Sequence, residues 1–181
     1  MDATAIIDTL TPLVPGAAFE VGASIDFATI YVPPAHLVAT CQALRDTPSL
    51  RFNAIIEITA ADYHPRHPRF EVVYHFLSVP NRLRVRLKVR VGENESVPTV
   101  QDVWPGAGWP EREVWDMFGI VFDGHPDLRR LLMPEDWEGH PARKDYPVQI
   151  HKAVQTYSPL EISEEQFAAN LARDRVTRTR S

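Results

Sequence analysis

The spacing of apolar residues divides the first half of the chain into short helices and a run of strands. Residues 2–10 carry isoleucine and leucine along one side, which predicts a short helix. Residues 19–32 alternate between apolar and polar side chains, which predicts two short strands or a hairpin through Gly22. Residues 35–45 return to helical spacing after a pair of prolines, so we expect a second helix there.

The clearest sheet signal covers residues 53–59, 70–79 and 82–91. In the last of these, five apolar residues alternate with five basic ones, namely Arg82, Arg84, Arg86, Lys88 and Arg90. One face of this strand must be buried, while the basic face either docks an acidic neighbour or is a solvated edge that resists aggregation. Strands joined by a tight Pro-Asn turn form an antiparallel meander. The sequence therefore predicts an α+β domain with a mainly antiparallel sheet and helices packed on one face.

The pattern changes in the last third of the chain. A short helix begins at Pro110 and ends at Gly119, and the following stretch to residue 157 has dense proline and charge without periodicity. We expect this stretch to be an extended proline-rich strap lying on another surface. A capping box at residues 163–166 opens a short terminal helix. The predicted organisation is an α+β domain at residues 1–119, followed by an interface strap and tail at residues 120–181.

Composition excludes several classes of function. The chain has 181 residues with a net charge of −5, which argues against a dedicated nucleic-acid binder. Its single cysteine, Cys41, excludes a disulfide framework and a self-contained iron–sulfur cluster, which takes four cysteine ligands. No apolar run approaches the roughly 18 residues of a membrane span, and the start of the chain lacks the regions of a signal peptide. We therefore expect membrane association only through a partner.

Candidate chemistry is sparse. His125 and His140 each stand in a Gly-His-Pro triplet, and they form either a metal or proton-relay pair or turns in which imidazole bonds the backbone. The acidic helix with Glu111 and Asp116 allows a general acid–base dyad, or acidic groups that stabilise the helix dipole, with Arg112 paired to Asp116 four residues on. The turn and the dipole are the favoured interpretations. A freestanding enzyme and a metal-binding module are kept as rivals.

Partner binding has more support than catalysis. Six large aromatic residues fall within the irregular part of the chain: Trp104, Trp109, Trp115, Phe118, Phe122 and Trp137. Tryptophan together with arginine is typical of interface hot spots. The composition of this region indicates a surface that works by contact.

Four consecutive motifs in this region carry a resemblance. They are Glu-Arg-Glu-Val-Trp-Asp-Met-Phe-Gly-Ile at residues 111–120, Gly-His-Pro-Asp-Leu-Arg-Arg-Leu-Leu at residues 124–132, Pro-Glu-Asp-Trp-Glu-Gly-His-Pro at residues 134–141, and Arg-Lys-Asp-Tyr-Pro at residues 143–147. The compound motif resembles the 30 kDa subunit family of respiratory complex I, which includes the C subunit of bacterial NADH:quinone oxidoreductase. Ala142 departs from the larger apolar residue usual in that family.

The resemblance implies a cofactor-free structural subunit in the hydrophilic arm of a proton-translocating complex, itself not catalytic. FMN, iron–sulfur clusters and quinone are then expected on partner subunits, especially the 49 kDa quinone-site subunit and the cluster-bearing subunits, with no nucleic acid bound. The location implied is peripheral, on the cytoplasmic side of the bacterial inner membrane or the matrix side in mitochondria. The alternative is an equivalent scaffold subunit of a membrane-bound hydrogenase or formate hydrogenlyase complex.

The same resemblance marks sixteen residues as candidate partner-interface residues, with no catalytic, cofactor-binding or metal site. They are Glu111, Arg112, Glu113, Asp116, Gly119, His125, Pro126, Arg129, Arg130, His140, Pro141, Arg143, Lys144, Asp145, Tyr146 and Pro147. If the strap is a separable clamp, deleting residues 120–147 leaves a foldable core and abolishes assembly.

Overall fold

The computed structural model of the protein describes residues 1–147, 163 and 165–167, which fall into two units, Met1–Tyr146 and Pro147–Ser181. In the second unit, the Gln166 N–H bonds the Ser163 hydroxyl and the Ser163 N–H bonds the Gln166 side chain, which confirms the predicted capping box. The domain boundary predicted at residue 119 falls inside the first unit.

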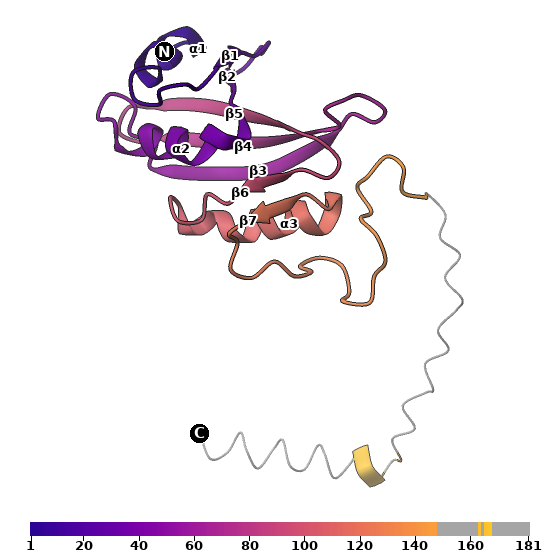
Figure 1. Ribbon diagram of the computed structural model, residues 1–181. Helices are drawn as coiled ribbons and strands as arrows, with labels where there is room; N and C mark the ends of the chain where they lie inside the picture. The colour runs from indigo at the N-terminus through magenta and orange to yellow at the C-terminus, as the bar shows by residue number, and fades with distance from the viewer. Residues whose placement is uncertain (148–162, 164, 168–181) are drawn as a thin grey trace, which may run out of the picture. The chain divides into compact units, whose positions relative to one another are not determined.

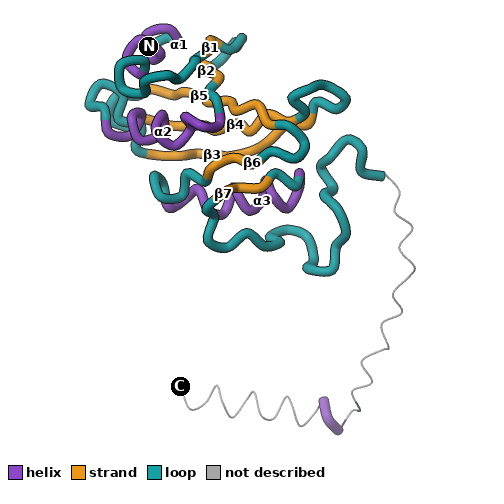
Figure 2. The backbone as a smooth tube through the Cα atoms, in the orientation of Figure 1, coloured by secondary structure: helices purple, strands orange, loops and turns teal. Residues whose placement is uncertain are grey.

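A five-stranded sheet forms the centre of the first unit (Figures 1 and 2). The strands, in spatial order, are β1 (Glu20–Val21), β2 (Ala28–Tyr31), β5 (Leu83–Val91), β4 (Phe70–Ser78) and β3 (Ala54–Asp62). β2 and β5 pair in parallel, and the other three pairs are antiparallel. The predicted α+β fold with a mainly antiparallel sheet is confirmed, but β5 is the central strand and the interpretation of its basic face as a sheet edge was wrong.

Helices cover one face of this sheet. α1 (Ala3–Leu10) is capped by Asp2, and η1 (Pro34–His36) leads into α2 (Leu37–Asp46). Their apolar sides join the inward side chains of β4 and β5 in one core, in which most members are fully buried. Each large apolar side chain buried in this way contributes about 1.5–3 kcal/mol. Cys41 lies in this core, where burial raises the pKa of its thiol well above the ordinary value.

The opposite face of the sheet carries polar and charged side chains, and we call it the open face. In β5 the residues alternate between buried valine or leucine and partly exposed arginine or lysine. The pairing of β4 with β5 places Glu71, His75 and Leu77 beside Arg90, Arg86 and Arg84 on this face. The alternation seen in the sequence therefore separates the core from the open face.

The remaining elements lie along β3 (Figure 1). β6 (Ser96–Pro98) pairs in parallel with β7 (Val121–Asp123), and between them run η2 (Pro105–Ala107) and α3 (Gly108–Phe118). β7 lies in the stretch that we expected to be an extended strap. Ile120 and Phe122 are each 2% exposed in the core, so a chain without residues 120–147 would lose part of its core, and the expectation of a separable clamp was wrong.

Candidate functional site

The motifs of residues 111–147, the signature segment, begin on α3 with a buried carboxylate. Glu111 is fully buried, and it accepts hydrogen bonds from the Thr99 hydroxyl and from the Val100 N–H at 2.8 Å. These bonds fasten α3 to the turn that follows β6. Burial raises the pKa of Glu111 above its ordinary value, although the two hydrogen bonds and nearby His125 act in the other direction.

Arg112 projects from α3 toward the later part of the signature segment. Its guanidinium donates to the carbonyl oxygens of Arg129 and Arg130, at 3.1 and 2.9 Å, and lies 3.4 Å from the Asp127 carboxylate. The side chain is nearly buried and also sits over the Trp109 ring, 5.0 Å from its centroid. A planar fork with five donors suits this simultaneous capture of carbonyls and a carboxylate.

Asp116 holds the next turn of the same segment. Its Oδ2 accepts hydrogen bonds from three consecutive backbone N–H groups, those of Leu131, Leu132 and Met133, at 2.7–2.9 Å. Its Oδ1 pairs with Arg130 at 2.8 Å. Burial raises the pKa of Asp116, but the bonds from Arg130 and the three N–H groups together lower it by more. The pKa of Asp116 is therefore below its ordinary value.

The pair predicted between Arg112 and Asp116 is therefore replaced by bonds from each residue to residues 127–133. The distance of four residues along α3 made the pair possible, but both groups are buried against a loop that offers backbone partners. The acid–base dyad that the sequence allowed stays untested, and Glu111 and Asp116 are both fully buried.

The two Gly-His-Pro histidines bond the backbone, as the favoured interpretation predicted. His125 Nε2 lies 3.0 Å from the Gly108 carbonyl, and its Nδ1 accepts from the Asp127 N–H. His140 Nδ1 lies 3.0 Å from the Asp116 carbonyl. Within the described residues no group of three or more histidine, cysteine or acidic side chains is arranged to hold a metal.

Gly119 ends α3 for two reasons. Its φ of 78° is the left-handed conformation of a helix cap, and its N–H bonds the Trp115 carbonyl. A Cβ at this position would also lie 2.6 Å from the His140 ring. The glycine thus lets the residues around His140 fold back against α3.

The end of the signature segment is tied to the hairpin between β3 and β4. Arg69, whose side chain is 3% exposed, forms paired bonds with both oxygens of Asp62 and of Asp145. Asp62 also accepts from the Lys144 N–H at 2.8 Å. The Arg69 guanidinium lowers the pKa of both aspartates well below the usual range. Glu93 completes the cluster, with bonds to Arg69 and Arg143.

The other predicted interface residues have fewer bonds within the chain. Tyr146 donates its hydroxyl to the Glu138 carbonyl at 3.0 Å, and Arg129 is 69% exposed beside Asp127. The rest are the exposed residues Glu113, Pro126 and Lys144, half-buried Pro141, and Pro147, the first residue of the second unit.

The aromatic cluster is divided between the core and the surface. Trp104 and Phe122 are buried, and Trp115 and Phe118 pack against the core. Trp109 is 64% exposed and borders a groove of about 160 Å³ together with Pro105 and Pro126. Trp109 is therefore the member of this group that is available for contact with a partner.

Residues outside the motifs also shape this site, above all Asp62 and Arg69, which sequence reasoning missed. A signal was present, because the two residues flank the loop of a predicted hairpin with opposite charges. Residues at such positions come opposite one another, as the bond between the Tyr63 N–H and the Arg69 carbonyl shows. The participation of Asp145, 76 residues further on, left no comparable signal.

Comparison with known proteins identifies the family of the chain. Residues 30–152 match the family described as the respiratory-chain NADH dehydrogenase 30 kDa subunit. The chain is 46% identical to the C subunit of NADH-quinone oxidoreductase from Roseiflexus sp. (strain RS-1), over 87% of this chain and 91% of that protein. It is 52% identical to the corresponding C subunit from Roseiflexus castenholzii, over 72% and 75%.

A solved structure shares the fold as well. A chain of the membrane-bound sulfane sulfur reductase, an archaeal respiratory membrane complex, superposes with a TM-score of 0.66 at 26% identity, covering 80% of this chain and 85% of that one. The fold and the signature segment define a class of α+β subunits found in respiratory membrane complexes. This chain belongs to the 30 kDa subunit family of the respiratory-chain NADH dehydrogenase.

Proposed function

We propose that the chain is a cofactor-free structural subunit of the hydrophilic arm of proton-translocating NADH:quinone oxidoreductase. The observation that carries the proposal is family membership over residues 30–152, which contain most of the sheet and the whole signature segment. The partners proposed are the 49 kDa quinone-site subunit and the cluster-bearing subunits, with FMN, iron–sulfur clusters and quinone held by them. The proposed location is the cytoplasmic side of a bacterial inner membrane.

The form of the signature segment supports a scaffolding role. Residues 124–146 contain no helix or strand, yet Arg112, Asp116 and Arg69 fix their backbone through buried charged bonds. A loop fixed in this way loses little conformational entropy on docking. Rigid supports hold neighbouring redox subunits at fixed separations better than mobile loops do. No helix within the part of the chain that the structure describes is long and apolar enough to cross a membrane, and in this proposal the partners supply the attachment.

The proposed contact surface includes two exposed apolar side chains, one just before the signature segment and one within it. Trp109 and Leu132 are 64% and 60% exposed. An exposed tryptophan stacked on an arginine, as Trp109 is on Arg112, is the composition from which interface hot spots are built.

A mild-detergent pull-down of the tagged chain from membranes tests this function. We expect flavin-, cluster- and quinone-site subunits to co-purify, with all metal and flavin assigned to those partners by analysis of the separated subunits. Trp109→Ala should reduce recovery of the partners about tenfold or more, while Leu13→Ala, which truncates a residue 51% exposed near α1, serves as the matched control. A wild-type chain recovered alone would overturn the proposal.

A second candidate function is the equivalent scaffold in a membrane-bound hydrogenase or related complex. The likeness to a chain of an archaeal respiratory membrane complex favours keeping it. The same pull-down separates the two, because a nickel–iron subunit without a flavin-bearing partner would identify the second.

A further inference from the structure

The open face of the sheet contains two arginines whose charge is left unbalanced. Three of the four cations in β5 are paired: Arg86 with Asp26 at 2.9 Å, Lys88 with Glu71 at 3.0 Å, and Arg90 with Glu20 at 2.9 Å. Arg84 in β5, and Arg82 in the turn just before it, form no ion pair with any residue that the structure describes. Positive charge therefore accumulates at one end of the open face.

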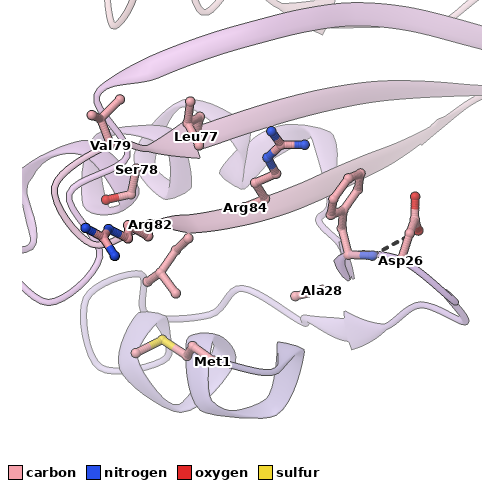
Figure 3. Close-up of a pocket in the computed structure, with 10 residues that line it drawn as sticks. Met1, Asp26, Ala28, Leu77, Ser78, Val79, Arg82 and Arg84 are labelled. Atoms are coloured by element: carbon pink, nitrogen blue, oxygen red, sulfur yellow. Dashed lines mark hydrogen bonds between the residues drawn. The ribbon is translucent and has the colours of Figure 1, made fainter.

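These two arginines border a groove of about 680 Å³, the arginine groove, which is larger than the groove beside Trp109 (Figure 3). Its other walls are mainly apolar, with Met1, two residues before α1, lying across from Leu77 in β4 and from Val79 just after that strand. Met1 and Val79 are 57% and 59% exposed. Apolar side chains this exposed around a basic end are typical of an interaction surface.

Phe27 connects the apolar and basic parts of the groove. Its ring lies 5.5 Å from the guanidinium of Arg84 and equally far from that of Arg86. Among the described residues that line the groove, Asp26 is the one carboxylate. It accepts two bonds from Arg86 and one from the Ser24 hydroxyl, so its charge is already balanced. Arg84 thus keeps its full charge beside an aromatic surface, the arrangement of residues in binding hot spots.

We propose that the arginine groove binds an acidic segment of a partner protein. Aspartate or glutamate side chains of that segment pair with Arg82 and Arg84, and an adjacent apolar residue packs on Phe27, Leu77 and Val79. The volume suits a short stretch of chain, and guanidinium groups recognise carboxylates through two parallel hydrogen bonds. The inference rests on the proposed function, since it requires the chain to sit among protein partners, and it adds a second contact surface away from the signature segment.

The chain offers a matched pair of variants for the test. Arg82→Glu with Arg84→Glu reverses two charges in the groove, one at a residue with positive φ and one over an aromatic ring. Arg51→Glu with Arg66→Glu makes the same changes outside it, because Arg51 also has positive φ and Arg66 lies over Tyr63. None of the four arginines has an ion pair within the described residues, so both double variants should keep the wild-type circular dichroism spectrum.

Two measurements on the assembled complex test the proposal. In the first, a photo-cross-linking amino acid replaces Val79. In the second, both double variants are used in pull-downs at increasing salt concentration. We expect a cross-link to an acidic segment of one partner, and about tenfold less of that partner recovered with the groove variant than with the control. Lysine substitutions in the cross-linked segment should restore recovery to the groove variant.

The remaining outcomes separate this inference from the proposed function. If the wild-type chain assembles with its partners and the groove variant assembles equally well, the inference is overturned and the proposed function stands. A cross-link to lipid, or to a non-acidic segment, would also overturn the inference. A wild-type chain that recovers no partner would overturn both.

Discussion

The innermost charges that hold the signature segment and the outermost ion pair of the open face differ in how much water reaches them. Arg69 and Asp62 have side chains 3% and 2% exposed, and Asp116 is fully buried. On the open face, Arg90 and Glu20 are 41% and 59% exposed, although their separation of 2.9 Å is nearly the same. Similar bonds therefore stand in very different surroundings.

This difference determines what each set of charges can do. Buried charges that lose one partner are left without water to replace it, so they fix the chain in one conformation. Exposed pairs contribute little to stability and can exchange partners. The charged signature residues that the sequence marked as an interface form most of their bonds within the chain. Arg82 and Arg84 have no ion-pair partner among the described residues, so their guanidinium groups remain available to a partner. Contact of the signature residues with partners stays a prediction.

Removing Arg69, which pairs with Asp62, Asp145 and Glu93, should have the largest effect on the free energy of unfolding. Arg69→Ala leaves Asp62 buried and unpaired and releases Asp145, so we expect a loss of about 3–5 kcal/mol in the free energy of unfolding, measured by urea denaturation of the full chain. Arg129→Ala, which removes a side chain 69% exposed, is the control and should change stability by less than about 0.5 kcal/mol. Equal losses in the two variants would mean that the buried position of Arg69 adds nothing to the stability of the chain.

Removing the carboxylate of Asp116 should have the second largest effect on the free energy of unfolding. Asp116→Ala leaves the N–H groups of residues 131–133 without their acceptor, and each unsatisfied buried group costs about 1–3 kcal/mol, reduced here because the loop can shift toward water. We expect a loss of about 2–4 kcal/mol and faster hydrogen exchange at those three amides. Amides that exchange at the wild-type rate would show that the carboxylate does not hold this turn.

Local patterns predicted the parts of the molecule that depend on nearby residues. Apolar runs bounded by loop and turn residues located β3 and β4, strict alternation located β5, and the predicted cap at Gly119 is the observed end of α3. Parallel pairing of β2 with β5, and of β6 with β7, joins segments distant in sequence, and periodicity carries no information about such pairs. For the same reason an edge position remained one of the two interpretations of the basic strand, although β5 is the central strand.

The candidate site shows the same division. The backbone bonds of His125 and His140 could be predicted from Gly-His-Pro alone. The partners of Arg112 and Asp116 could not, because the helix offered a plausible pair four residues apart and the loop that replaced it has no regular structure. Dense charge and proline also hid the core contacts of Ile120 and Phe122.

The pH dependence of stability should separate Glu111 from the aspartates. Asp62, Asp116 and Asp145 have lowered pKa values, so the stability they contribute is complete above about pH 4 and is lost as the pH falls further. Glu111 has a raised pKa, so its contribution declines as the pH rises from about 4 through that pKa.

Glu111→Gln isolates the contribution of Glu111, because glutamine keeps an acceptor for the Val100 N–H but does not titrate. Unfolding free energies from about pH 3 to 8 should show the variant gaining on the wild type as the pH rises above about 4. A difference between the two proteins that does not vary with pH would mean that Glu111 is not held in a setting that disfavours its charge.

The smallest effect on stability is expected for the exposed ion pair between Arg90 and Glu20 on the open face. A double-mutant cycle on Arg90 and Glu20, with each changed to alanine singly and together, should give a coupling energy of about 0.2–1 kcal/mol that falls further in about 0.5 M salt, because both side chains are solvated. The same cycle on Arg69 and Asp62 should give a value several times larger and nearly independent of salt. A strong, salt-insensitive coupling between Arg90 and Glu20 would mean that the open face is as fixed as the signature segment. Its charges would then not be free to exchange their partners for those of a neighbouring protein in the complex.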